Sequence, residues 1–244
     1  MRNLSMLVSG AVAAVAFAGS AMGSQSWTVD RYAPQVFDVV GSNITLGLRS
    51  AGFEANRPAP FNSGFYNYQG MKTTPDWLDT SAGSFVSIEM YVSDSWNDGV
   101  RAGMWTTMSN GNLTYPIIEY TKGTSTAGVV GAGEFTGFRW WQSGQGWTQI
   151  NAAVTTNQWY RMTIGLTSSV VTFDITDVAG GTSIFSSTVG NLGAQKIDNV
   201  ILNAHNQGIA GEYDVQYRNF AVVPAPGAIA LLGLAGVAGR RRRA

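Results

Sequence analysis

The stretch that decides the fold reads Trp159-Tyr-Arg-Met-Thr-Ile-Gly-Leu166, then a Thr-Ser-Ser turn, then Val170-Val-Thr-Phe-Asp-Ile175. Its larger apolar side chains fall at every second position: Tyr160, Met162, Ile164, Leu166, Val171, Phe173 and Ile175. Because successive side chains of a strand point to opposite faces, this alternation is typical of half-buried antiparallel strands. The stretch therefore predicts a β-hairpin with one face in a core.

The same alternation recurs outward from this hairpin. Phe85-Val-Ser-Ile-Glu-Met-Tyr-Val92 places four apolar residues on one face of a strand. Further strands are predicted near residues 44–49, 64–71, 100–107, 115–121, 134–141, 146–151, 183–188, 197–203 and 213–222. Glycine-containing turns such as Asn97-Asp-Gly99 separate them. A sustained helical period is found only at the two ends, so the sequence predicts an all-β, two-sheet antiparallel sandwich of the jelly-roll type.

Composition limits the class of protein. Of the 244 residues, 45% are hydrophobic and 11% aromatic, which is enough for a large core. The chain has no cysteine, which excludes disulfides, thiolate metal sites and cysteine nucleophiles. A body of about 200 residues can be stable through its core alone, because larger domains bury more of their surface.

The formal net charge of zero conceals an acidic body. All 15 acidic residues lie between Asp30 and Asp214, whereas Arg2 and the four arginines at 240–243 lie at the chain ends. The body therefore carries ten of the 15 basic residues against 15 acidic ones, a net charge of −5. Such a body repels phosphate backbones, and we expect no nucleic-acid partner.

Residues 1–23 have the order of a helical secretory signal peptide. One positive charge, Arg2, precedes an apolar run from Met6 to Phe17, and small residues follow. The run is shorter than the roughly 20 residues that span a bilayer, which favours a cleaved signal over a membrane anchor. Cleavage by signal peptidase after Ala21 and cleavage after Gly23 both satisfy the small-residue rule.

Residues 223–244 form a tail with the parts of a stop-transfer segment. A Pro-Ala-Pro-Gly turn ends the preceding strand, an apolar helix is predicted from Ala228 to Ala238, and an arginine cluster follows. The apolar helix can enter the bilayer while the arginines stay on the cytoplasmic side. So short a span holds weakly, which predicts a transient contact with the inner membrane through this transmembrane helix.

This tail resembles the PEP-CTERM sorting signal of Gram-negative bacteria. The matching residues are Pro224, Pro226, Gly227, the apolar stretch, Arg240, Arg241, Arg242 and Arg243. Ala225 stands where that signal usually has glutamate. The resemblance implies that an exosortase-like processing enzyme removes the tail and passes the body to the cell surface or the extracellular matrix.

Residues 27–222 resemble the concanavalin A-like lectin/glucanase superfamily, which includes laminin-G-type domains. The resemblance is carried by Phe85–Val92, by the hairpin at 159–175 and by a closing strand, Asp214-Val-Gln-Tyr-Arg-Asn-Phe220. Asn157-Gln-Trp-Tyr-Arg-Met-Thr-Ile164 is similar to the late strand that precedes such a hairpin in these domains. The resemblance implies a lectin-like jelly roll that binds carbohydrate.

Two candidate catalytic patterns are incomplete. Laminarinase-type glycosidases of that superfamily carry a Glu-x-Asp-x-Glu strand, whereas Glu212-Tyr-Asp-Val-Gln216 ends on an amide that transfers no proton. His205, the single histidine of the sequence, lies in a predicted loop that has no nucleophile-elbow motif. The sequence therefore predicts no catalytic residue, and we expect a protein that is not an enzyme.

Tryptophans that flank a turn are the main candidates for sugar contact. Trp140 and Trp141 are neighbours on a predicted strand, so they point to opposite faces and one of them can be exposed. An exposed indole suits the apolar face of a sugar ring. The predicted carbohydrate-binding residues are Trp141, Trp147, Arg139, Asn203 and His205. The alternative is that both tryptophans are buried.

Calcium is the one cofactor that the sequence suggests. Asp94, Asn97 and Asp98 offer oxygen ligands on one predicted turn, and calcium takes six to eight oxygens from such loops. The alternative is that these residues only shape the turn, since Asp and Asn are ordinary turn residues.

These features together predict an exported protein of the cell surface or extracellular matrix. We expect a non-catalytic, carbohydrate-binding β-sandwich, with an extracellular polysaccharide as partner. The alternatives are a structural envelope or matrix protein without a specific ligand, and a glycosidase that acts on polysaccharide.

Overall fold

The computed structural model describes residues 25–49, 68–73, 84–109, 113–123, 135–205 and 212–223. All regular elements within these ranges are strands, in agreement with the predicted all-β class. No helix of the described residues is long and apolar enough to cross a bilayer. The helices predicted in residues 1–23 and in the tail lie outside the described residues.

An eight-stranded antiparallel sheet forms one layer. Its strands, in spatial order, are β1 (Thr28–Arg31), β4 (Gln69–Thr73), β14 (Lys196–His205), β6 (Arg101–Ser109), β8 (Ile117–Thr121), β9 (Gly137–Gln142) and β10 (Gly146–Gln149). The short β7 (Leu113–Thr114) pairs with the end of β6.

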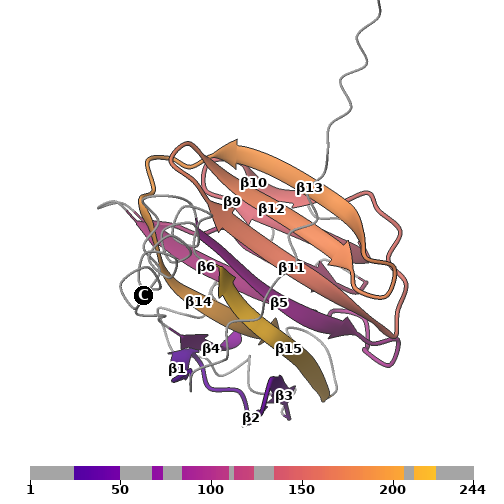
Figure 1. Cartoon of the computed structure of the whole chain (residues 1–244). Coiled ribbons are helices and arrows are strands. Elements are labelled where there is room, and N and C mark those ends of the chain that lie inside the picture. The colour runs from indigo at the N-terminus through magenta and orange to yellow at the C-terminus, as the bar shows by residue number, and fades with distance from the viewer. Residues whose placement is uncertain are drawn as a thin grey trace, which may run out of the picture.

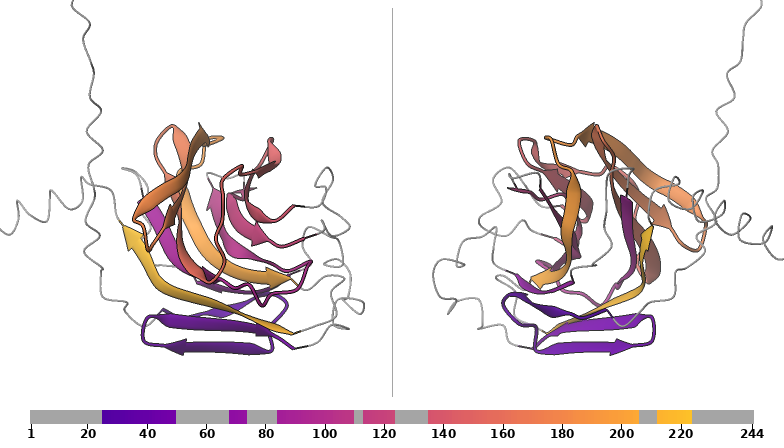
Figure 2. Two further views of the ribbon diagram at one scale, coloured as in Figure 1. Left: turned by 90° about the vertical axis from the view of Figure 1, so that its right-hand side faces the viewer. Right: turned by 60° about the vertical axis from the view of Figure 1, so that its left-hand side comes forward.

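A seven-stranded antiparallel sheet forms the second layer, so the predicted two-sheet sandwich is confirmed (Figure 1). Its order is β13 (Thr182–Gly190), β12 (Val170–Asp177), β11 (Gln158–Leu166), β5 (Ser84–Val92), β15 (Tyr213–Val223), β3 (Asn43–Leu48) and β2 (Val36–Val40). The N-terminal strands, drawn in indigo and purple, close one end of both layers (Figure 2).

The hairpin that decides the fold is confirmed in its register. Met162 pairs with Ile175, and Ile164 pairs with Phe173. The seven alternating side chains of this hairpin are at most 2% exposed, and they pack in the core between the sheets. Strand β5 adds Val86, Ile88, Met90 and Val92 to the same core, as the alternation predicts.

The sequence pattern does not predict β1, β2 and β7. Strand β2 reads Val-Phe-Asp-Val-Val and lies at a sheet edge, where Val39 and Val40 stay 46% and 73% exposed. An edge strand with exposed apolar residues on both faces has no clean period of two. Strands β1 and β7 are only four and two residues long, too short to show a period.

Two tyrosines of β15 cross the core and bond the backbone of the opposite sheet. The hydroxyl of Tyr217 lies 3.0 Å from the carbonyl oxygens of both Gly103 and Asn203, to which it donates. The hydroxyl of Tyr213 donates in the same way to the carbonyls of Arg101 and His205. Burial is the main cause that raises the pKa of Tyr217 above its ordinary value. These hydroxyls fix the spacing and register of one layer against the other.

We expect Tyr217→Phe to lower the free energy of unfolding by about 1–3 kcal/mol, because it leaves buried carbonyls without their donor. Denaturant unfolding measures this loss. Tyr91→Phe is the matched control, since Tyr91 is half-buried on the outer side of β5 and should change stability by less than about 0.5 kcal/mol. Equal effects of the two variants would contradict the structural role of Tyr217.

Candidate functional site

The side of the eight-stranded sheet that faces away from the core carries most of the candidate chemistry; we call it the outer face. Strand pairing arranges its residues in rows that cross the strands. One row is Ile201, Trp105, Ile117, Trp141 and Trp147. The next row is Asn203, Gly103, Glu119, Arg139 and Gln149. An apolar row therefore lies beside a polar one.

A buried charge cluster lies in the polar row. The guanidinium of Arg101 donates from Nε to Oε1 of Glu119 at 3.1 Å, and that of Arg139 donates to the same oxygen at 2.7 Å. Arg101 and Arg139 are each 2% exposed, and Glu119 is 0% exposed. Gly103 makes this row possible, because a Cβ on it would lie 2.6 Å from the Cα of Glu119. Arg139 also stacks on the indole of Trp147, with Cζ 4.1 Å from the ring centroid.

Opposing effects act on the ionisation of Glu119. Burial alone would raise its pKa, because it disfavours the charged form. The positive charges of Arg101 and Arg139, and their hydrogen bonds to the carboxylate, outweigh burial and hold the pKa below its ordinary value of 4.5. Glu119 is therefore a carboxylate that neutralises part of a buried positive cluster.

A pocket of about 260 Å³ opens on the outer face beside the apolar row. Its lining comes from β1, β6, β14, the residue before β4 and the segment before β8: Asp30, Arg31, Tyr68, Trp105, Thr107, Tyr115, Asp198, Asn199 and Ile201. Tyr68 packs on Trp105 with ring centroids 4.6 Å apart. The pocket thus combines aromatic walls with carboxylate, amide and hydroxyl groups.

Asp30 anchors the pocket at the β1 side. The hydroxyl of Tyr68 donates to its Oδ2 at 2.5 Å, and Nζ of Lys72 lies 3.2 Å from its Oδ1. Burial, followed by the charge of Asp30, raises the pKa of the Tyr68 phenol, so it stays a donor. Arg31 has a left-handed backbone, with φ of 64°, which is costly for a residue other than glycine. Such strain is concentrated at functional sites.

A β-bulge shapes the other side of the pocket. The pairing of β14 with β6 shifts between Ile197 and Asn199, so Asp198 is the extra residue. Asn199 pairs with Thr107, and the bulge brings Asp198 beside them on the pocket. Oδ1 of Asp198 is 2.9 Å from Nζ of Lys196. The bulge therefore directs two consecutive polar residues toward one place.

The sequence-predicted sugar contacts lie on this outer face, although none of them lines the pocket. Trp140 points into the core and is 6% exposed, whereas Trp141 lies on the outer face, as their adjacency predicts. Trp141 and Trp147 are half-buried beside Arg139. Asn203 and His205 are both 0% exposed. His205 ends β14, so the predicted loop at this residue is wrong.

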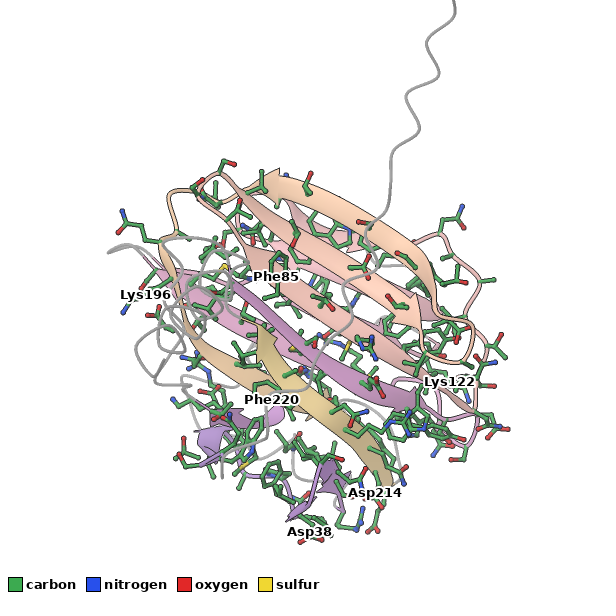
Figure 3. The ribbon with its side chains drawn as sticks, viewed as in Figure 1. Asp38, Phe85, Lys122, Lys196, Asp214 and Phe220 are labelled. Carbon is green, nitrogen blue, oxygen red and sulfur yellow. The ribbon has the colours of Figure 1, made fainter. Side chains whose placement is uncertain are left out.

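The predicted calcium turn lies at the end of β5, and Asp94, Asn97 and Asp98 are exposed there. The ammonium of Lys122 donates to the carbonyl of Asp94 at 2.7 Å and also to that of Trp96. Lys122 and Lys196 lie on opposite sides of the molecule in the view of Figure 3. Within the described ranges, no group of three or more His, Asp or Glu side chains could hold a metal ion. Calcium binding here stays a prediction.

The incomplete glycosidase pattern lies far from the pocket. Asp214 and Gln216 are on β15 of the seven-stranded sheet, where the alternate residues Tyr213, Val215 and Tyr217 fill the core. Asp214 instead pairs with Arg49, whose Nη2 is 2.6 Å from Oδ1. Asp214 therefore belongs to an ion pair on the outer side of the seven-stranded sheet.

Comparison with known proteins shows the fold. No family model and no curated protein sequence matches the chain. A sialidase structure matches with a TM-score of 0.51 and 11% identity over 82% of this chain, which spans only 17% of that protein. A β-1,3-glucanase from Mycobacterium marinum matches with a TM-score of 0.48 and 14% identity, over 84% of this chain and 94% of that one.

A third similar structure is the catalytic domain of a GH131 β-glucanase from Podospora anserina. It matches with a TM-score of 0.43 and 10% identity, over 75% of this chain and 72% of that one.

The similarity to the sialidase structure corrects the prediction that the chain is not an enzyme, because this fold also occurs within an enzyme and so does not exclude one. That prediction rested on two local patterns, the strand from Glu212 to Gln216 and the surroundings of His205. The two carboxylates of the pocket, Asp30 and Asp198, come from β1 and β14 instead. No single-strand pattern joins residues so far apart in sequence.

We expect Glu119→Gln to lower the free energy of unfolding by about 3–5 kcal/mol, since it leaves two buried guanidinium groups without a counter-charge. Urea unfolding measures the difference. Glu212→Gln is the matched control: its side chain is 59% exposed and 3.9 Å from Arg49, so we expect a change below about 1 kcal/mol. A Glu119→Gln protein as stable as this control would contradict the cluster.

The same cluster predicts acid sensitivity. Because the pKa of Glu119 is lowered from 4.5 in the folded protein, its stabilising contribution is complete above that pH and is lost as the pH falls through the folded-state pKa. Stability curves between pH 6 and pH 3 should fall below pH 4.5 in the unaltered protein. Glu119→Gln should show a shallower fall, and an identical slope would contradict the prediction.

Proposed function

We propose that this chain is a carbohydrate-active β-sandwich protein that binds saccharide in the pocket beside Trp105. The observation that carries the proposal is the composition of that pocket: Tyr68, Trp105 and Tyr115 stand with Asp30 and Asn199 around one cavity of about 260 Å³. Ligand sites generally combine apolar and aromatic walls with a few placed polar groups. The jelly-roll fold and the carbohydrate-active names of the matched structures support the same class of ligand.

A sugar ring suits the two kinds of wall in this pocket. Its C–H faces can lie against the aromatic rings, which offer large apolar area with a polar tip. Its hydroxyls can donate to the carboxylate of Asp30 and to the amide oxygen of Asn199. Lys72 and Tyr68 hold Asp30 in place from the sides, so the acceptor is oriented before the ligand enters.

We further propose that the protein works outside the cell, at the surface or in the extracellular matrix. The support is the signal-like order of residues 1–23 and the PEP-CTERM-like order of residues 223–244. Signal peptidase and an exosortase-like enzyme would be the processing partners, and the inner membrane a transient contact. Mass spectrometry of the mature protein tests this, because both termini of the full-length chain should be missing.

Glycoside hydrolysis is the second candidate, favoured by the two carboxylates on one pocket. Glycosidases use a pair of acidic side chains, one to protonate the leaving oxygen and one as base or nucleophile. Asp30 and Asp198 are the pair that this pocket offers. Release of reducing ends from laminarin and related glucans, abolished by Asp30→Asn or by Asp198→Asn, would establish it. No turnover by the unaltered protein on any such glucan would reject it.

We expect Tyr115→Ala to weaken saccharide binding by about tenfold, because the pocket loses one aromatic wall. Calorimetric titration with soluble oligosaccharides, chosen by a glycan array, gives the affinity. Tyr91→Ala is the matched control, as Tyr91 is equally half-buried but lies on the seven-stranded sheet. Equal binding by the two variants would contradict the pocket as the site. An array without any bound glycan would favour the structural matrix protein.

A further inference from the structure

We propose that the bulge side of the pocket binds the protonated amine of an amino sugar, so that the protein selects hexosamine-containing saccharides. The inference rests on the proposed function, that the pocket holds a saccharide. It is carried by three oxygen atoms at the bulge: Oγ1 of Thr107, Oδ2 of Asp198 and Oδ1 of Asn199.

The fold brings these three oxygens to one place. Thr107 and Asn199 are direct register partners on β6 and β14, and opposite side chains of paired strands have Cβ atoms about 5 Å apart. Asp198 is the bulged residue next to Asn199, and all three side chains line the pocket. A regular strand would send Asp198 to the face opposite from Asn199. The bulge is therefore what concentrates acceptors here.

All three oxygens are buried and lack a hydrogen-bond partner within the described part of the chain. Thr107 as a whole is only 8% exposed. A buried polar atom without a partner costs about 1–3 kcal/mol, so such atoms are rare in folded proteins. Such atoms also occur on Gln69, Gln142 and Asn203, but those at the bulge are oxygens of three side chains that line one pocket, where a donor group from a ligand can complete the site.

The chemistry of the three atoms favours an ammonium group. A carboxylate oxygen and an amide oxygen only accept hydrogen bonds, and a hydroxyl can accept as well. An ammonium carries three N–H donors and no acceptor, so it can satisfy the three oxygens together. A neutral sugar hydroxyl has one donor and would leave two of them unpaired. The bond to Asp198 would also be charge-assisted, which roughly doubles its strength.

A calcium ion fits this place less well. Calcium takes six to eight oxygens, whereas the side chains at the bulge offer three unpartnered ones. The ammonium of Lys196 already lies 2.9 Å from the other oxygen of Asp198, and its charge opposes a divalent ion more than a monovalent one. Tyr115, the half-buried aromatic residue of the lining, can support a sugar ring attached to the amine.

The test compares three soluble trisaccharides by calorimetric titration of the whole mature chain at pH 6: the glucosamine trimer, the N-acetylglucosamine trimer and cellotriose. We expect the glucosamine trimer to bind at least about tenfold more tightly than the other two. Asp198→Asn should abolish this preference, so that the three trisaccharides bind this variant with affinities within about twofold of one another. Thr107→Val, which keeps the side-chain shape, should reduce the preference in part.

The control is Asp38→Asn, which makes the same charge change at an exposed position on β2, away from Lys196 (Figure 3). It should keep the full preference, which separates a local contact from the net charge of the protein. Thermal melts confirm that each variant is folded.

The outcomes separate the two proposals. Equal binding of all three trisaccharides, or a preference that survives in Asp198→Asn, overturns the amine site and leaves saccharide binding intact. Binding of none of them, on a glycan array as well, overturns the proposed function and the amine site together. Calcium that stabilises the unaltered protein but not Asp198→Asn, with no preference among the sugars, replaces the amine by a metal ion.

Discussion

Burial of β6 on both of its faces is the constraint on which the rest of the molecule depends. Eight of its nine residues are buried, which an antiparallel strand with one solvated face would not show. Ala102, Met104 and Met108 fill the core between the sheets, while Arg101 and Trp105 are buried on the outer face. The backbone of β6 also receives the hydroxyls of Tyr213 and Tyr217 from the opposite layer. This strand therefore connects the two sheets, and it contributes Trp105 and Thr107 to the lining of the pocket.

A buried outer face must satisfy its own polar groups, and the chain does so unevenly. In the polar row, Glu119 is bonded by both arginines. Glu89 on the seven-stranded sheet is similarly bonded, by Arg161 at 2.6 Å and Arg218 at 2.7 Å. At the bulge, Oγ1 of Thr107, Oδ2 of Asp198 and Oδ1 of Asn199 lack such partners within the described ranges, whereas Oδ1 of Asp198 pairs with Lys196. The two carboxylate clusters stabilise the fold, whereas the acceptors at the bulge are the ones that the proposed amine would satisfy.

The sequence predicts the architecture better than it predicts the site, for a physical reason. Period two within one strand is a local property, so the hairpin at 159–175 and the strand at 85–92 follow from the sequence directly. The opposite directions of Trp140 and Trp141 follow in the same way. The pocket instead joins residues from position 30 to position 201, and their meeting depends on strand order. Only the bulge at Asp198 and the backbone of Arg31 make the geometry specific, and neither leaves a clear sequence signal.

The same distinction explains why a pattern within one strand cannot decide whether the pocket carries catalytic groups. A single strand that supplies all the catalytic acids must carry them at every second position, because only alternate side chains share a face. Such a pattern can be recognised from the sequence alone. A pocket built across a sheet can take one carboxylate from each of several strands, and here Asp30 and Asp198 belong to strands separated by β4. Glu212 and Asp214 instead form ion pairs with Arg49, on the outer side of the seven-stranded sheet. What the protein would do to the proposed saccharide depends on the side chains that line the pocket, Asp30 and Asp198 among them.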